Sequence, residues 1–144
     1  MGYPGIVRKG SAIYIAEPIF AQYKRIGSRW CKTIALNVLD LLLAEPLVRH
    51  DGPSTVEATL NEQTTENRRV LHLLHYIPER RCDRIDTIED VIPLYDLGVS
   101  IRADQPVTSV TCVPQGEALE FAEKNGRIDF VLPKLEGHQM IELA

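Results

Sequence analysis

The stretch Pro46-Leu47-Val48-Arg49-His50-Asp51-Gly52-Pro53 decides how this chain folds, because the pattern of apolar residues changes its period there. Before it, residues 28–43 carry apolar side chains at helical spacing; after it, apolar and polar side chains alternate as they do in strands. Pro46 prevents the helix from continuing, and Asp51-Gly52-Pro53 is a turn sequence. The sequence therefore predicts a first domain over residues 1–47 and a second over residues 48–144.

The first part contains one predicted strand and one predicted helix. Residues 12–16 are apolar throughout, which suits a strand covered on both faces in a parallel sheet. Ser28 is a residue type that caps helices, and the helix after it has one apolar face. A lone strand and helix cannot bury a core, so we expect the last βα piece of an α/β domain. We expect the helix face to pack on the second domain or on a second copy of the chain. That face consists of Trp30, Ile34, Val38, Leu41 and Leu42.

The second part is predicted to be mainly β. Asn125-Gly126 lies between two alternating segments and predicts a tight hairpin turn with positive φ at both positions. Gly137 predicts a further turn. Six or seven short strands with turns between them indicate an antiparallel, immunoglobulin-like β-sandwich preceded by the strand-helix segment. The clearest predicted strands cover residues 56–60, 70–77, 97–101, 107–113 and 128–132.

The composition excludes several classes of function. The chain has 144 residues, 20 acidic and 16 basic, and its basic side chains are interspersed with acids, so no nucleic-acid partner is expected. Its three cysteines are widely spaced, which favours reduced thiols in a cytoplasmic protein over a disulfide framework or a zinc site. No apolar run is long enough to span a membrane. We expect no cofactor.

Two patterns resemble catalytic or metal sites but lack the necessary context. Glu17 follows the apolar strand, where barrel enzymes place an acid or base, but glycoside cleavage by the usual route needs two carboxylates. No second strand of that kind is present, so no catalytic residue is predicted. His72 and His75 would share a face only in a helix. Because their surroundings predict a strand, the two imidazoles should lie on opposite faces, and no metal site is predicted.

The most polar segment covers residues 79–90, and two interpretations of it stay open. It is either a solvated connection with local ion pairs or a docking loop that contacts another domain. The candidate docking residues are Arg80, Arg81, Arg84, Ile85 and Ile88.

The aromatic side chains could in principle stack on a sugar ring. They are scattered singly at positions that alternation assigns to the core, so we expect core packing instead. These residues are Trp30, Tyr76, Tyr95 and Phe121.

Several stretches together carry a family resemblance. In the first part they are Ile13–Phe20, which reads IYIAEPIF, and Arg29–Lys32, which reads RWCK, followed by the Leu-rich helix. In the second part they are LVRHDGPST from Leu47 and LHLLHYIPERR from Leu71. In this respect the chain resembles the β-galactosidases of glycoside hydrolase family 42. Residues 1–47 resemble the end of their amidotransferase-like trimerisation domain, and residues 48–144 resemble the small C-terminal β domain that follows it.

The resemblance implies a function without catalysis. In that family the catalytic glutamates sit in an N-terminal barrel that this chain lacks, so no active-site residue carries over. We therefore expect a non-catalytic accessory or oligomerisation portion of a β-galactosidase-like protein. Its partners would be further copies of itself or a missing N-terminal catalytic region. The alternative is a stand-alone carbohydrate-binding β-sandwich module.

Overall fold

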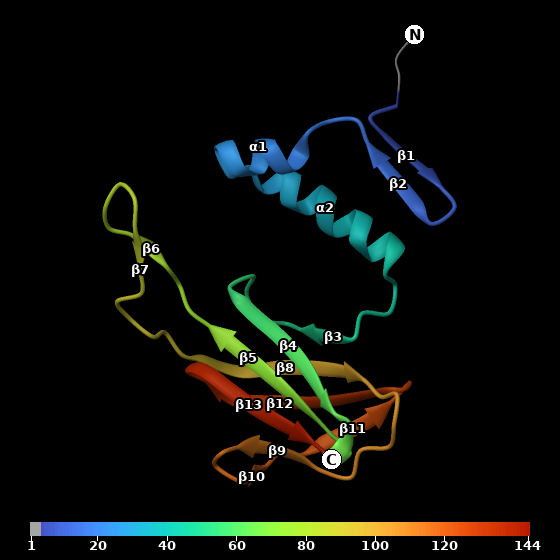
Figure 1. Ribbon diagram of the computed structural model, residues 1–144, viewed down its shortest axis with the longest axis vertical. Coiled ribbons are helices and arrows are strands. Elements are labelled where there is room, and N and C mark those ends of the chain that lie inside the picture. Colours follow the sequence, from blue (N-terminus) through green and yellow to red (C-terminus); the bar gives the residue numbers. More distant parts are fainter. Residues whose placement is uncertain (1–3) are drawn as a thin grey trace. The chain divides into compact units, whose positions relative to one another are not determined.

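The computed structural model describes residues 4–144 and divides the chain into two compact units. The first unit ends at Pro46, and the second comprises Leu47–Ala144 (Figure 1). This division lies one residue before the predicted boundary. That the first unit comes from a trimerisation domain stays a prediction.

The first unit begins with a β-hairpin rather than with a strand of a parallel sheet. β1 (Ile6–Lys9) pairs antiparallel with β2 (Ala12–Ile15), and Gly10 makes the turn with φ +59°. The prediction of a strand buried on both faces is wrong, since the side chain of Tyr14 is 68% exposed. The physical reason is local: a glycine that adopts positive φ lets residues 6–9 fold back on the next strand.

Two helices follow the hairpin, where the sequence predicted one. α2 (Arg29–Leu42) begins after Ser28, as predicted. α1 (Ile19–Ile26) was not predicted; it ends at Gly27, whose φ is +60° and whose N–H donates to the Tyr23 carbonyl at 2.8 Å. Left-handed glycine is a common helix end. Ile19 and Cys31 are the buried apolar residues of this unit among those described.

The second unit is an antiparallel β-sandwich, which confirms the predicted fold class (Figure 1). Its five-stranded sheet has the order β10 (Glu117–Ala118), β9 (Val110–Val113), β13 (Gly137–Leu143), β5 (Arg68–His75) and β4 (Val56–Gln63). Its four-stranded sheet has the order β11 (Phe121–Lys124), β12 (Arg127–Leu135), β8 (Leu94–Arg102) and β3 (Val48–His50). The short 3-10 helix Thr64–Glu66 joins β4 to β5.

A small hairpin projects from the connection between β5 and β8. It consists of β6 (Glu79–Arg80) and β7 (Asp86–Thr87), paired antiparallel apart from the two main sheets (Figure 1). The polar segment of residues 79–90 is therefore partly regular.

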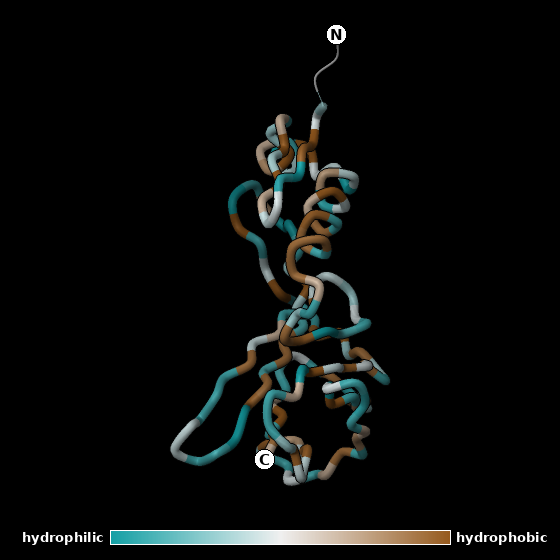
Figure 2. The backbone as a smooth tube through the Cα atoms, turned by 90° about the vertical axis from the view of Figure 1, so that its right-hand side faces the viewer, coloured by the Kyte–Doolittle hydropathy of each residue, from teal (hydrophilic) through white to brown (hydrophobic). Residues whose placement is uncertain are grey.

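Alternate residues of the two sheets form one apolar core. On β12 the side chains of Ile128, Phe130 and Leu132 are buried, whereas Val131 is 52% exposed. Figure 2 shows the same alternation of apolar and polar segments along the strands of this unit. Burial between two facing sheets is what fixes the register of each strand. The buried core comprises Val56, Leu71, Leu73, Leu97, Val99, Ile101, Val110, Cys112, Ile128, Phe130, Leu132, Leu135, Ile141 and Leu143.

The predicted hairpin turn is confirmed. Asn125 has φ +53° and Gly126 has φ +70°, and the two residues join β11 to β12. Gly137 also adopts positive φ, at +71°, and a Cβ there would lie 2.7 Å from the Tyr76 hydroxyl.

Neighbouring residues of β12 test this arrangement. Leu132→Ala should lower the free energy of unfolding by about 2–5 kcal/mol, because it opens a cavity between the sheets. Val131→Ala removes a side chain that is half exposed and should cost less than about 1 kcal/mol. Urea unfolding of the two variants measures both values. Equal losses would contradict the assignment of these residues to opposite faces.

Candidate functional site

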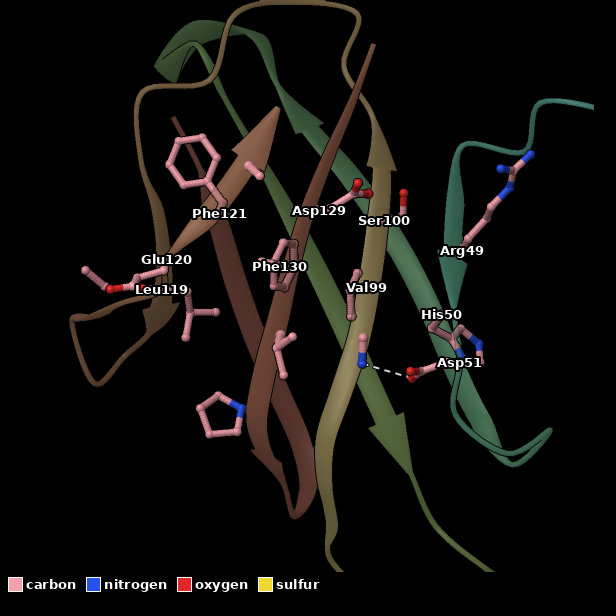
Figure 3. A pocket seen from close by; sticks show the side chains of 15 residues that line it. Arg49, His50, Asp51, Val99, Ser100, Leu119, Glu120, Phe121, Asp129 and Phe130 are labelled. Atoms are coloured by element: carbon pink, nitrogen blue, oxygen red, sulfur yellow. Dashed lines mark hydrogen bonds between the residues drawn. The ribbon is translucent and has the colours of Figure 1, made fainter. Parts of the chain in front are cut away.

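An open groove lies over the outer face of the four-stranded sheet. Its volume is about 960 Å³, and strands β3, β8, β11 and β12 contribute to it (Figure 3). We call it the sheet groove. It is lined by Arg49, His50, Asp51, Gly98, Val99, Ser100, Ala118, Leu119, Glu120, Phe121, Ala122, Asp129, Phe130, Val131 and Pro133.

Strand alternation decides which of these side chains form the floor. Val99 and Phe130 belong to the core, so Ser100 and Asp129, which follow or precede them, lie on the opposite face. Asp129 pairs with Ser100 in the register of β12 and β8, and Arg49 pairs with Ser100 from the other side. A row of polar residues therefore crosses the sheet from β12 to β3.

A carboxylate is fixed at the β3 side of the groove. Oδ1 of Asp51 accepts a hydrogen bond from the Gly98 N–H at 2.9 Å, drawn in Figure 3. The carboxylate lies over Gly98, because a Cβ on Gly98 would be 2.7 Å from Oδ2. The absence of a side chain at position 98 is thus what gives Asp51 its place.

A buried arginine holds the serine in the middle of the groove. Nε of Arg127 donates to Oγ of Ser100 at 2.7 Å, and Nη2 donates to the Ser100 carbonyl at 2.9 Å. Arg127 is 8% exposed. Oγ of Ser100 accepts from the guanidinium, and its O–H can donate to a further group. The contact with Arg127 therefore fixes the position of the hydroxyl oxygen.

Asp129 lies opposite Ser100 in the pairing of β12 with β8, on the face of the sheet that forms the groove. It is partly buried, and within residues 4–144 its carboxylate takes part in no hydrogen bond or ion pair with the protein. Figure 3 shows it beside Ser100, with Leu119 and Phe121 on one side and Asp51 on the other. The groove thus offers three carboxylates, those of Asp51, Glu120 and Asp129, and the hydroxyl of Ser100, beside apolar side chains such as Leu119 and Phe121. Carboxylates and a hydroxyl are groups that hydrogen-bond to a polar ligand.

The solved structures that match this chain include a closely similar one. The α-L-fucosidase isoenzyme 2 from Paenibacillus thiaminolyticus matches 97% of the chain with a TM-score of 0.92 and 35% sequence identity. The chain covers 22% of that fucosidase. A scan of protein families finds no match, and a search of curated proteins finds none either.

The chain is related to a portion of a glycoside hydrolase. At this level the prediction from sequence is confirmed. The solved relative is named as an α-L-fucosidase, so a relation to β-galactosidases of family 42 in particular is not shown and stays a prediction.

The residues predicted to form an interface lie as an incomplete stripe on α2. Trp30, Leu41 and Leu42 are 48%, 57% and 42% exposed, and Ile34 and Val38 are partly buried. Figure 2 shows that much of this helix is apolar. The exposed apolar surface extends beyond the predicted stripe, because α1 and other positions of α2 contribute to it. The additional residues are Phe20, Tyr23, Ile26, Leu36, Leu39 and Leu43.

The predicted docking residues are brought together around the β6–β7 hairpin. Arg80 forms an ion pair with Asp86, and Arg81 with Glu79 at 2.7 Å and Glu89 at 2.9 Å. Arg84 is exposed, and Ile85 and Ile88 are 61% and 51% exposed. The ion pairs agree with the interpretation of this segment as a solvated connection. The exposed side chains of Ile85 and Ile88 agree with its interpretation as a docking loop. Whether this segment docks stays a prediction.

The aromatic side chains depart from the expected core packing. Trp30 is 48% exposed and Tyr95 is 66% exposed, so the prediction is wrong for these two. Tyr95 lies on the outer face of β8 opposite Lys134, because Leu94 packs against the core and Asp96, with φ +53°, interrupts the alternation before Leu97. Phe121 packs partly against the core, and it is the one aromatic of the predicted set that lines the sheet groove.

The two histidines of β5 lie on opposite faces, as predicted. His75 is 2% exposed, and its Nδ1 lies 3.2 Å from the Thr55 hydroxyl. On the outer face, Nδ1 of His72 lies 3.1 Å from Nε2 of His138.

The described residues contain no group that suits a metal ion. Within residues 4–144 no three His, Cys, Asp or Glu side chains lie close enough to bind one. Over the same residues, no helix is both long and apolar enough to cross a membrane. Cys31 and Cys112 are buried, and burial raises the pKa of the Cys112 thiol.

The β6–β7 hairpin gives a pH-dependent prediction. The hydrogen bond from Arg80 lowers the pKa of Asp86 below its ordinary value. A lowered carboxyl pKa means that the ion pair persists as the pH falls and is lost only below the ordinary range. Arg80→Gln should return the Asp86 pKa to that range, as measured by carboxyl-carbon NMR titration. The Asp104 carboxyl, whose pKa is lowered by Arg102, is the control that should not move.

Proposed function

We propose that this chain is a non-catalytic accessory portion of a glycoside hydrolase, in which catalysis belongs to another part of the protein. The observation that carries the proposal is the match of nearly the whole chain to 22% of an α-L-fucosidase. A segment of that size leaves most of such an enzyme to other residues. The sheet groove supports the proposal, because its side chains suit binding.

The substrate of the parent enzyme follows from the same similarity. The solved relative is named for α-L-fucosides, and we propose this class of glycoside first. The sequence resemblance of residues 10–43 and 47–81 favours β-galactosides and keeps them as the second class.

The accessory role that we propose for the first unit is self-association. Phe20, Ile26 and Leu41 are 74%, 61% and 57% exposed, which is a large apolar surface for so small a unit. A second copy of the chain would cover it, and the catalytic region of the parent is the other possible cover. The three unpaired cysteines favour a reducing, cytoplasmic location.

The mass of the chain in solution tests self-association. We expect light scattering on a sizing column to show an oligomer for the full chain and a monomer for a shorter chain that begins at Leu47. Leu41→Asp places a charge on the apolar face. This charge would be buried without a partner in the oligomer, so the association constant should fall at least tenfold. Lys32→Asp, on the same helix, is the matched control. A monomeric full chain with an unchanged melting temperature in Leu41→Asp would refute this role.

Hydrolysis assays test the absence of catalysis. We expect the full chain to release no nitrophenol from the nitrophenyl α-L-fucoside or the nitrophenyl β-galactoside above the rate in buffer. Glu17 lies on an exposed bend after β2 and lines neither the sheet groove nor the smaller cavity near Arg69. Turnover that disappears in Glu17→Gln would overturn the proposal.

A further inference from the structure

We propose that the sheet groove binds a neutral oligosaccharide across strands β12, β8 and β3. The inference goes beyond the accessory role and stands without it, because it concerns residues of the second unit alone. It rests on the positions of Asp51, Ser100 and Asp129, on the negative charge of the carboxylates in the groove and on the volume of the groove.

The size of the groove suits a small ligand. Its volume of about 960 Å³ lies at the upper end of the range for small-molecule sites, roughly 300–1,000 Å³. Apolar side chains from β12 and the segment before β11 line it, including Leu119, Val131 and Pro133. Such surfaces pack against the C–H groups of a sugar ring.

The hydrogen-bonding groups match a polyol. Asp129 has a carboxylate that no protein group engages, and Oδ2 of Asp51 lies above Gly98 with no hydrogen bond from the described residues. Carboxylates only accept, and sugar hydroxyls donate. Ser100 adds a hydroxyl whose O–H can donate while its oxygen accepts from Arg127. Neighbouring hydroxyl groups of a sugar can donate to the carboxylates of Asp51 and Asp129 and accept from the hydroxyl of Ser100 between them.

The charges favour a neutral ligand over an anionic one. Asp51, Glu120 and Asp129 all line the groove, against two arginines: Arg49, which lines it too, and Arg127, whose guanidinium contacts Ser100; both arginines are engaged by the protein. A phosphate or an acidic peptide would meet net negative charge there. A neutral sugar meets no such cost, and hydrogen bonds from its hydroxyls to carboxylates are among the stronger kind.

The spacing of the two carboxylates indicates more than one sugar ring. Asp129 lies on β12 and Asp51 follows β3, with β8 between them. Neighbouring strands are about 4.8 Å apart, so the two groups are separated by roughly 10 Å across the sheet. We therefore assign one ring to Asp129 and Ser100, and the next to the floor at Gly98 beside Asp51.

Sugar titrations of the full chain test this inference. The probes are lactose and methyl α-L-fucoside, added up to 50 mM in steps while backbone amide signals are followed by NMR. We expect saturable shifts at residues 98–100 and 129–131, with lactose binding more tightly than the single ring. Asp129→Asn should weaken lactose binding by about tenfold or more, since it removes hydrogen bonds to a charged group.

Two further variants separate binding from folding. In Gly98→Ala the new Cβ would displace the Asp51 carboxylate, so lactose binding should weaken while the amide spectrum stays that of a folded chain. Glu57→Gln changes an exposed carboxylate of β4, in the other sheet, and should leave binding unchanged. No saturation at 50 mM with either probe would overturn the inference, as would equal binding by wild type and Asp129→Asn. Neither result bears on self-association or hydrolysis, which are measured without sugar binding.

Discussion

The burial of alternate side chains between the two sheets is the constraint on which the second unit depends. Leu71 and Leu73 of β5 face Ile101, Ile128 and their neighbours across one core, and most of these are fully buried. Every inward residue determines that the next one points outward. Asp129 therefore reaches the outer face because Ile128 and Phe130 are held inside. The groove is a consequence of the core, and a register shift by one residue would remove it.

Two polar contacts fix the positions of side chains on the outer face of the four-stranded sheet. The hydrogen bond between Asp51 and the Gly98 N–H attaches the end of β3 to β8, which also bonds β3 through the backbone. Arg127 joins β12 to β8 through Ser100. A buried guanidinium costs free energy unless its N–H groups are satisfied, so Arg127 requires the Ser100 carbonyl and hydroxyl. The same contacts that satisfy the arginine fix the position of the serine hydroxyl oxygen.

Sequence reasoning found the parts of the fold that depend on local patterns. The turn at Asn125-Gly126 and the alternation along β4, β8 and β12 followed directly from residue order. Helix α1 was missed although its signals are present: Pro18 before it, Lys24 and Arg25 in its last turn, and Gly27 at its end. The groove could not be found in this way, because Asp51, Ser100 and Asp129 are distant in sequence. Only strand order and register bring them together.

The two units differ in how far each satisfies its own apolar surface. In the second unit fourteen apolar residues are buried in one cluster, whereas the first unit buries only Ile19 and Cys31 among its described residues. Apolar burial is the main favourable term in folding, so a unit that buries so little is marginal when isolated. The exposed faces of α1 and α2 are the apolar surface that the proposed self-association would bury. The sandwich instead buries its apolar residues in its own core, and the groove lies on its outer face, away from that core.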